Sequence, residues 1–259
     1  MLTENRLKKA INDGKLALGM VNALPLPVMV EMVGYAGYDF IVIDQSRVGV
    51  GPEGLENLIR AAECANITPL VRVPSSAPEV ILRALDAGAQ GIFVPRVRSR
   101  EEAQAVVRAA RFHPHGARGL SDGRLNGFGR MALSEFVPRA NRQLLVGVSI
   151  EDRDGVDAVD SIVTVDGLDL VMDEAVSLSH AYGVPGRLDH PDVQAAIRKV
   201  ASACQRNGVW YCATPRLPGE AERWFREGAA ALLLGDDRNV AFRALQAHVG
   251  NVRLELTNE

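Results

Sequence analysis

The sequence predicts a single-domain (β/α)₈ (TIM) barrel of the α/β class. Eight short apolar runs alternate with longer helical patterns along 259 residues. The runs are apolar throughout, which is typical of parallel strands buried on both faces. Barrels of this kind usually contain about 250 residues. The alternative is an open doubly wound sheet, but the G-x-G-x-x-G turn that usually follows its first strand is missing here.

The apolar runs give the expected strands, which are residues 16–24, 40–44, 69–73, 91–96, 144–151, 167–173, 210–214 and 231–235. The clearest amphipathic helices between them are expected at 52–66, 77–87, 100–111, 190–207 and 217–227. Several of these helices end in a glycine just before the next strand, as at Gly208, and glycine suits a left-handed helix C-cap. The stretch 112–141 is too long for a simple connection, and we expect a long loop insertion of the kind that is usually functional or mobile.

Composition excludes several classes of protein. The 29 basic and 32 acidic side chains nearly balance, which argues against a nucleic-acid partner. The apolar runs are far shorter than the roughly 20 residues that span a bilayer, and the polar start lacks the apolar run of a signal peptide. Three cysteines (Cys64, Cys204 and Cys212) are too few for a disulfide framework. We therefore expect a cytoplasmic protein with no membrane partner.

Chemistry in such barrels lies at the carboxyl ends of the strands. Acids and arginines gather at these positions, among them Asp44, Arg47, Arg72, Arg96, Glu151, Asp173 and Glu174. Carboxylates can hold a divalent cation, and guanidinium groups can hold an anionic substrate. Arg72 and Glu151 are the strongest candidates because each interrupts an apolar strand, where a charge without a partner is costly.

Two other chemistries lack their residues. The four lysines (Lys8, Lys9, Lys15 and Lys199) all fall in helical patterns, so no lysine is placed to form a Schiff base. His113 and His115 form an H-x-H pair, but the pair follows a helix, and we interpret it as loop structure rather than a zinc site.

Several motifs resemble the HpcH/HpaI aldolase family over roughly residues 5–250. They are GYDFIVID, PLVRVP, LDAGAQGIFVPRVRSREEAQAVVRAARFHPHGARG, VSIEDRDGV, GLDLVM, LSHAYG and DHPDVQAAI. The resemblance implies a (β/α)₈ barrel whose final helix is often exchanged between subunits, in dimers that assemble into hexamers. It also implies metal-dependent aldol chemistry on 2-oxo acids. Pyruvate, as its enolate, chelates Mg²⁺, Mn²⁺ or Co²⁺ in this family, and an arginine stabilises the enolate oxygen.

The resemblance assigns three residues directly. Asp44 matches the family's aspartate, Arg72 its enolate-binding arginine, and Glu151 its first metal carboxylate. The remaining motif positions differ. The family's D-G-E-H is Asp44-Gln45-Ser46-Arg47 here, so Arg47 replaces the general-base histidine. Ser149 replaces a glutamine, and the family's G-P-A-D-L-S becomes residues 174–179, with Ser177 at the second metal carboxylate.

These differences change the expected chemistry. A guanidinium, with a pKa above about 12, cannot accept a proton at neutral pH. A serine hydroxyl is a poor ligand for a hard cation, so a divalent metal is expected to be weakly held or absent, with Asp173, Glu174 or Ser177 as its second ligand beside Glu151. The substrate-binding residues are expected to suit a molecule richer in carboxylates than pyruvate, and they are Arg47, Arg72, Arg124, Val176 and Ser177.

The leading hypothesis is a carbon–carbon lyase or synthase that acts on a 2-oxo acid of the pyruvate or oxaloacetate class through a stabilised enolate. Arg72, Asp44 and Arg47 are its catalytic candidates, with Asp44 or a substrate carboxylate moving protons. A special case is the citrate-forming condensation of siderophore biosynthesis, as in some family members. The alternatives are a metal-independent biosynthetic enzyme and a non-catalytic member of the family. A homo-oligomer is expected throughout.

Overall fold

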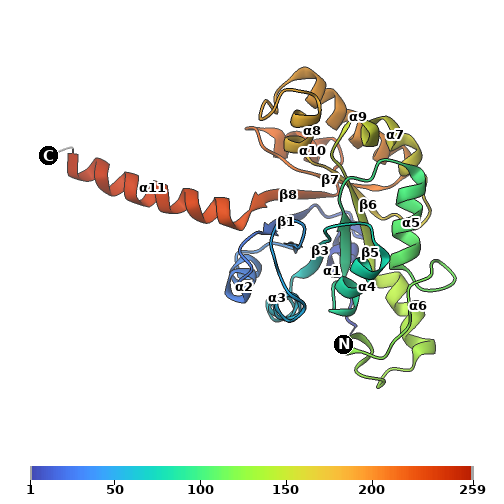
Figure 1. The fold of residues 1–259 in the computed structure, drawn as a ribbon. Helices are drawn as coiled ribbons and strands as arrows, with labels where there is room; N and C mark the ends of the chain where they lie inside the picture. The colour runs from blue at the N-terminus through green and yellow to red at the C-terminus, as the bar shows by residue number, and fades with distance from the viewer. Residues whose placement is uncertain (1, 258–259) are drawn as a thin grey trace.

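A computed structural model describes residues 2–257 and contains a closed barrel of eight parallel strands, paired in sequence order with β8 beside β1 (Figure 1). All eight expected strands are confirmed, with ends that move by at most three residues. The strands are β1 (Ala17–Asn22), β2 (Phe40–Asp44), β3 (Thr68–Arg72), β4 (Gly91–Val94), β5 (Leu145–Ile150), β6 (Leu170–Asp173), β7 (Trp210–Ala213) and β8 (Ala231–Asp236).

Helices lie before, between and after the strands, and most of them cover the outside of the barrel (Figure 1). They are α1 (Arg6–Asn12), α2 (Pro27–Tyr35), α3 (Pro52–Cys64), α4 (Pro78–Asp86), α5 (Arg100–Ala110), α6 (Leu133–Gln143), α7 (Arg153–Ile162), α8 (Ala175–Ala181), α9 (Pro191–Asn207), α10 (Glu220–Arg226) and α11 (Asp237–Thr257). The five helices expected from the sequence are α3, α4, α5, α9 and α10. A proline in the first turn starts α3, α4 and α9, and Gly208 caps α9 in the left-handed region, with φ at 68°. None of the described helices is both long enough and apolar enough to cross a membrane.

The insertion at 112–141 is not a plain loop. It contains a 3₁₀ turn at Arg124–Asn126 and most of α6. Phe112, Met131 and Phe136 form a small apolar cluster of their own, separate from the main core. The backbone N–H of Leu2 donates to the carbonyl of Leu125 (2.7 Å), so this cluster lies beside the N-terminal segment. The insertion therefore packs at the amino end of the barrel.

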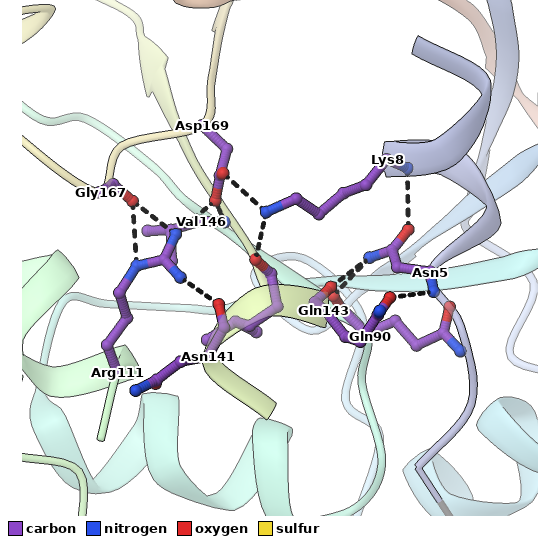
Figure 2. Close-up of polar contacts among 10 residues, drawn as sticks. Asn5, Lys8, Gln90, Arg111, Asn141, Gln143, Val146, Gly167 and Asp169 are labelled. Carbon is purple, nitrogen blue, oxygen red and sulfur yellow. Dashed lines mark hydrogen bonds and ion pairs between the residues drawn. The ribbon is translucent and has the colours of Figure 1, made fainter. Parts of the chain in front are cut away.

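A polar network closes that amino end (Figure 2). The Asp169 carboxylate accepts from Lys8 of α1 (2.8 Å), from Arg111 at the end of α5 (2.7 Å) and from the backbone N–H of Val146 (2.8 Å). Asn5 donates to the carbonyls of Gln90 (3.0 Å) and Gln143 (2.8 Å), which precede β4 and β5. Because α1 is held across this end, access to the barrel interior is from the carboxyl end.

The barrel interior is packed with alternating large and small side chains. The Phe40 ring fills the space beside Gly19, where an added Cβ would lie 2.1 Å from a ring carbon, and the Phe93 ring does the same beside Gly147 (2.8 Å). Successive strand residues point to opposite faces, so every second residue faces inward. Two residues farther along the strands, toward their carboxyl ends, the inward-facing side chains are polar. They are Asp44, Arg72, Ser149 and Glu174, and they form the floor of the barrel mouth.

The last helix, α11, extends away from the barrel instead of folding back onto it (Figure 1). Asp237, its first residue, is buried and bound to the segment that follows β1. Its carboxylate accepts from the N–H groups of Ala23 (2.8 Å) and Leu24 (3.1 Å) and from the amide of Asn22 (2.7 Å). These bonds hold the start of α11 and so determine the direction in which it leaves.

Candidate active site

Arg72 is the centre of the barrel mouth. It ends β3, is 6% exposed, and is paired in register with Asp44 at the end of β2. Its Nε donates to Asp44 Oδ1 (3.1 Å) and its Nη2 donates to Asp44 Oδ2 (2.6 Å). Ser46 adds two further bonds to Asp44 Oδ1, from its backbone N–H (2.9 Å) and its hydroxyl (2.6 Å). The guanidinium is therefore held in one orientation by its neighbour on the next strand.

A second carboxylate contacts Arg72 from farther around the barrel. Nη1 of Arg72 donates to Oε1 of Glu174 (3.2 Å), which follows β6 and is 102 residues away in the sequence. The backbone N–H of Glu174 donates to the carbonyl of Ile150 (3.1 Å), so Glu174 continues the β5–β6 pairing and faces inward like Met172 two residues before it. Both charges of this ion pair are buried.

These contacts determine the protonation states of Arg72 and Asp44. Burial alone lowers the pKa of Arg72, but the hydrogen bonds and charge of Asp44, with the charges of Glu174 and Glu151, raise it overall. Burial raises the pKa of Asp44, and its bonds to Arg72 and Ser46 outweigh this, so the pKa of Asp44 is lowered. Arg72 stays a cation and Asp44 stays a carboxylate, which makes Asp44 a weak proton acceptor.

Glu151 lies on the same face of the mouth. It is half-buried at the end of β5, and its Oε1 accepts from the hydroxyl of Ser149 (2.8 Å). Its charge acts on Arg72, so the two residues that the sequence singles out do lie in one site. Ser149, which replaces the family's glutamine, positions this carboxylate.

Asp173 is not part of the mouth, although we expected it as a possible metal ligand. It is one residue from Glu174 and therefore points to the opposite side of β6, where it is completely buried. Its carboxylate accepts from the hydroxyls of Tyr211 and Thr214. Burial raises the pKa of Asp173 to about 6 even though these hydrogen bonds lower it. In this position it cannot share an ion with Glu151.

Arg124 is also misplaced by the sequence prediction, which assigned it to substrate binding. Arg124 pairs with Glu63 at the end of α3, and its Nη1 lies 2.4 Å from where a Cβ on Gly88 would be. Gly88 precedes β4, so Arg124 lies at the amino end of the barrel, opposite the mouth. The insertion that carries Arg124 packs there, which is why the prediction fails.

The other predicted substrate residues remain at the carboxyl end. Arg47 is exposed in the turn after β2, and it has no ion-pair partner among the described residues. Val176 is exposed and Ser177 is half-buried, and both lie in the first turn of α8. Arg96 follows β4, is exposed, and has a left-handed backbone with φ at 56°.

The donor set does not fit a resident divalent cation. Glu151 faces the mouth, but Glu174 is bound to Arg72, Asp173 points away, and Ser177 offers a neutral hydroxyl. Within residues 2–257, no group of three His, Cys, Asp or Glu side chains comes together as a metal site. Mg²⁺ is usually bound through one or two carboxylates together with waters and substrate oxygens, and of these protein ligands the mouth offers Glu151 alone.

A comparison with known families identifies the family of the chain. The sequence profile of the HpcH/HpaI aldolase/citrate lyase family matches residues 19–244. The chain belongs to this family. Its members are carbon–carbon lyases and synthases of 2-oxo acids, so this HpcH/HpaI protein is an enzyme of the aldolase type, and the expected lyase or synthase class is confirmed.

Individual HpcH/HpaI proteins resemble the chain over almost its full length. The 5-keto-4-deoxy-D-glucarate aldolase of Shigella boydii is 32% identical over 246 residues, which are 93% of this chain and 94% of that protein. The crystal structure of the citrate synthase SbnG is 35% identical, with a TM-score of 0.91, and covers 97% of this chain and 99% of its own. A family member from Burkholderia cenocepacia is 28% identical, with a TM-score of 0.89, over 96% of this chain and 99% of its own.

Sequence reasoning missed how the mouth residues of this HpcH/HpaI protein are joined. It treated Glu174 only as a substitute metal ligand, whereas Glu174 is an ion-pair partner of Arg72. It also assigned no role to Ser46, which makes two hydrogen bonds to Asp44. The backbone bond could have been anticipated, because an aspartate that begins a turn commonly accepts from the N–H two residues later.

Proposed function

We propose that this enzyme is a synthase that joins an acetyl-type nucleophile to the keto carbon of oxaloacetate, as in the formation of citrate. The observation that carries this proposal is the barrel mouth, which contains the arginine of the enolate chemistry and Glu151 but has Ser177 at the position of the second metal carboxylate of an aldolase. The similarity to a citrate synthase over 97% of the chain supports the same choice.

Arg72 would carry the negative charge that develops on oxygen in this reaction. A guanidinium has five N–H donors, of which Asp44 takes two and Glu174 takes one. Two N–H groups remain, one on Nη1 and one on Nη2. Donors held rigidly at a developing oxyanion typically account for about 10²- to 10³-fold in rate.

Arg47 and Arg96 would bind the carboxylates of oxaloacetate. Both are exposed arginines at the carboxyl end of the barrel, and neither has an ion-pair partner among the described residues. Guanidinium groups bind carboxylates through two parallel hydrogen bonds. A substrate with two carboxylates suits this pair better than pyruvate, which has one.

We further propose that any divalent ion, Mg²⁺ or Mn²⁺ included, is weakly held and needs bound substrate. Glu151 would be its protein carboxylate, and the 2-oxo acid would supply further oxygens. This rests on the family resemblance and on Ser177 at the position of the second carboxylate. The condensation itself needs only the proton transfers and the oxyanion contacts described above.

The test is the reaction of acetyl-CoA with oxaloacetate in water, with and without a chelator. The condensation forms citryl-CoA, whose thioester bond water then hydrolyses to citrate and the free thiol of CoA, and these products are measured. Citrate in both conditions supports the proposal. The second candidate is aldol cleavage, which the 32% identity to a 5-keto-4-deoxy-D-glucarate aldolase favours. Release of pyruvate from that sugar acid, without citrate from the first pair, would replace the proposal with this candidate.

The assembly we propose is a dimer in which α11 of each subunit packs on the other. One side of α11 carries Phe242, Leu245, Val249, Val252 and Leu256, spaced three or four residues apart and all exposed. A second exposed stripe lies on α2, with Val28, Met32 and Tyr35. Two exposed apolar stripes on one chain indicate an interface between copies. A reducing compartment such as the cytoplasm suits the three unpaired cysteines.

A further inference from the structure

Glu174 stands out among the mouth residues because the chemistry described above gives it no role. It is a buried carboxylate, 7% exposed, and it lies where the family motif has a glycine. A carboxylate added to a mouth that must bind an anionic substrate works against binding unless it serves another purpose. Its contact with Arg72 indicates what that purpose is.

We propose that Glu174 is the general base that removes the proton from the carbon nucleophile, in place of the family's histidine. The inference rests on the proposed enolate reaction and assigns the proton transfer within it. Arg47, which replaces that histidine in the sequence, cannot take the proton because a guanidinium is fully protonated at neutral pH.

The geometry puts the base next to the oxyanion position. Glu174 Oε1 accepts from Nη1 of Arg72 at 3.2 Å, and the unused N–H groups of Arg72 are on Nη1 and Nη2. An enolate oxygen bound to those two groups is therefore beside the Glu174 carboxylate. The carbon that loses its proton is only two bonds from that oxygen, within the reach that a general base requires.

The other carboxylates of the mouth are less suitable. Asp44 accepts four hydrogen bonds, two from Arg72 and two from Ser46, and its pKa is lowered. Glu174 accepts one side-chain hydrogen bond, and that bond is long. Glu151 accepts from Ser149 and acts on Arg72 only through its charge. None of the five histidines directly follows a barrel strand.

The step balances without any further reactant. The C–H bond of the methyl group breaks, and the proton forms an O–H bond on Glu174. The electron pair moves into the new C=C bond and the carbonyl pair onto oxygen, where Arg72 donates to it. The enolate carbon then attacks the keto carbon of the acceptor, and the alkoxide that forms is available to take the proton back from Glu174.

The test compares the variant Glu174→Gln with wild type in two measurements. The first is exchange of methyl protons of acetyl-CoA and of pyruvate in D₂O, followed by proton NMR. The second is the affinity for oxalate, a stable mimic of an enolate. Glutamine retains the oxygen that accepts from Arg72 but cannot take a proton. We expect exchange to fall by about 10²-fold or more, and oxalate affinity to change by less than about 3-fold, because the amide oxygen still accepts from Arg72.

Two further variants sharpen the result. Glu174→Asp keeps a carboxylate with a shorter reach and should recover part of the exchange. Glu79→Gln removes an equal charge at an exposed position on α4 and should exchange like wild type. Exchange by Glu174→Gln at the wild-type rate would overturn the assignment. Equal losses of exchange and of oxalate affinity would also overturn it, because they would reduce Glu174 to a residue that holds Arg72.

The same experiment separates this inference from the proposed function. Wild type that exchanges methyl protons but forms no citrate contradicts the proposed condensation, and a loss of exchange in Glu174→Gln still supports the base. Wild type that forms citrate, together with a Glu174→Gln variant that also exchanges normally, contradicts the base alone. Wild type that does neither contradicts both.

Discussion

Arg72 and Asp44 lie side by side at the ends of adjacent strands and are joined by two hydrogen bonds, of 3.1 and 2.6 Å. The arrangement uses one edge of the guanidinium for support and leaves N–H groups on its terminal nitrogens for a ligand. Since both side chains are buried, replacing either residue with a neutral one removes the partner of the other charge in the barrel mouth. The pair therefore serves the fold and the proposed chemistry together.

Replacing Arg72 with lysine should reduce kcat/KM by about 10²- to 10³-fold, because lysine retains the charge but loses the planar fork. The protein should remain folded at the assay temperature, since the cation still neutralises Asp44. Steady-state kinetics with circular dichroism melting checks both points. Unchanged activity would mean that Arg72 is only a structural ion-pair residue.

Arg47 and Arg124 should respond differently to alanine substitution. Arg47→Ala should raise KM for oxaloacetate by about 10-fold or more, the value of one charge-assisted hydrogen bond. Arg124→Ala removes an ion pair with Glu63 at the other end of the barrel, so KM should not change while the melting temperature falls. A KM effect in Arg124→Ala would restore it as a substrate residue.

Metal affinity should depend on position 177. Wild type should bind Mg²⁺ or Mn²⁺ weakly, and Ser177→Asp should tighten binding without substrate because it adds a second carboxylate at the end of the barrel where Glu151 lies. Glu151→Ala should abolish binding. Metal and oxaloacetate should raise each other's affinity by the same factor. Calorimetry on the three proteins is the measurement, and tight metal binding by ligand-free wild type would contradict the interpretation of Ser177.

Stability should depend on pH through Asp173. Its pKa is about 6 in the folded protein against 3.8 ordinarily, so the folded state holds the proton more tightly than the unfolded chain does. Its contribution to the free energy of unfolding therefore falls as pH rises from about 4 to 6 and stays low above that range. Asp173→Asn cannot ionise, so its stability relative to wild type should improve by about 1 kcal/mol between pH 5 and 8.

Urea unfolding of both proteins at the two pH values measures this difference. The amide beside Tyr211 and Thr214 also changes the free energy of unfolding in a way that does not depend on pH. That change cancels when the difference between the two proteins is compared at the two pH values. The matched control is Asp166→Asn, an exposed position. A difference that does not change with pH would show that Asp173 is ionised as easily in the folded protein as in the unfolded one.

Oligomeric state should depend on the apolar stripe of α11. Wild type should sediment as a dimer or a multiple of dimers, and Leu245→Lys with Val249→Lys should yield monomers because the charges would be buried in the interface. Met32→Lys on α2 should weaken the same assembly. Asn251→Lys, exposed on the side of α11 away from the stripe, is the control. A monomeric wild type at micromolar concentration would contradict the exchanged helix.

The sequence by itself determined the barrel. Each strand could be recognised alone, because burial on both faces makes a run such as residues 40–44 apolar wherever it lies in the fold. The order of the units then required the carboxyl ends of all strands to meet, and this brought Asp44, Arg72 and Glu151 into one site before any contact was known.

Only the tertiary structure decided which of these side chains act together. Asp173 and Glu174 are adjacent and chemically similar, yet β6 places one behind the barrel wall and the other against Arg72. Arg124 lies in an insertion whose packing no periodicity predicts, and its apolar cluster with Phe112 and Phe136 carries it to the amino end. The apolar character of a buried strand is a local property that can be read from the sequence. A contact such as that of Arg72 with Glu174 forms only when the closing barrel brings distant strands around a common axis.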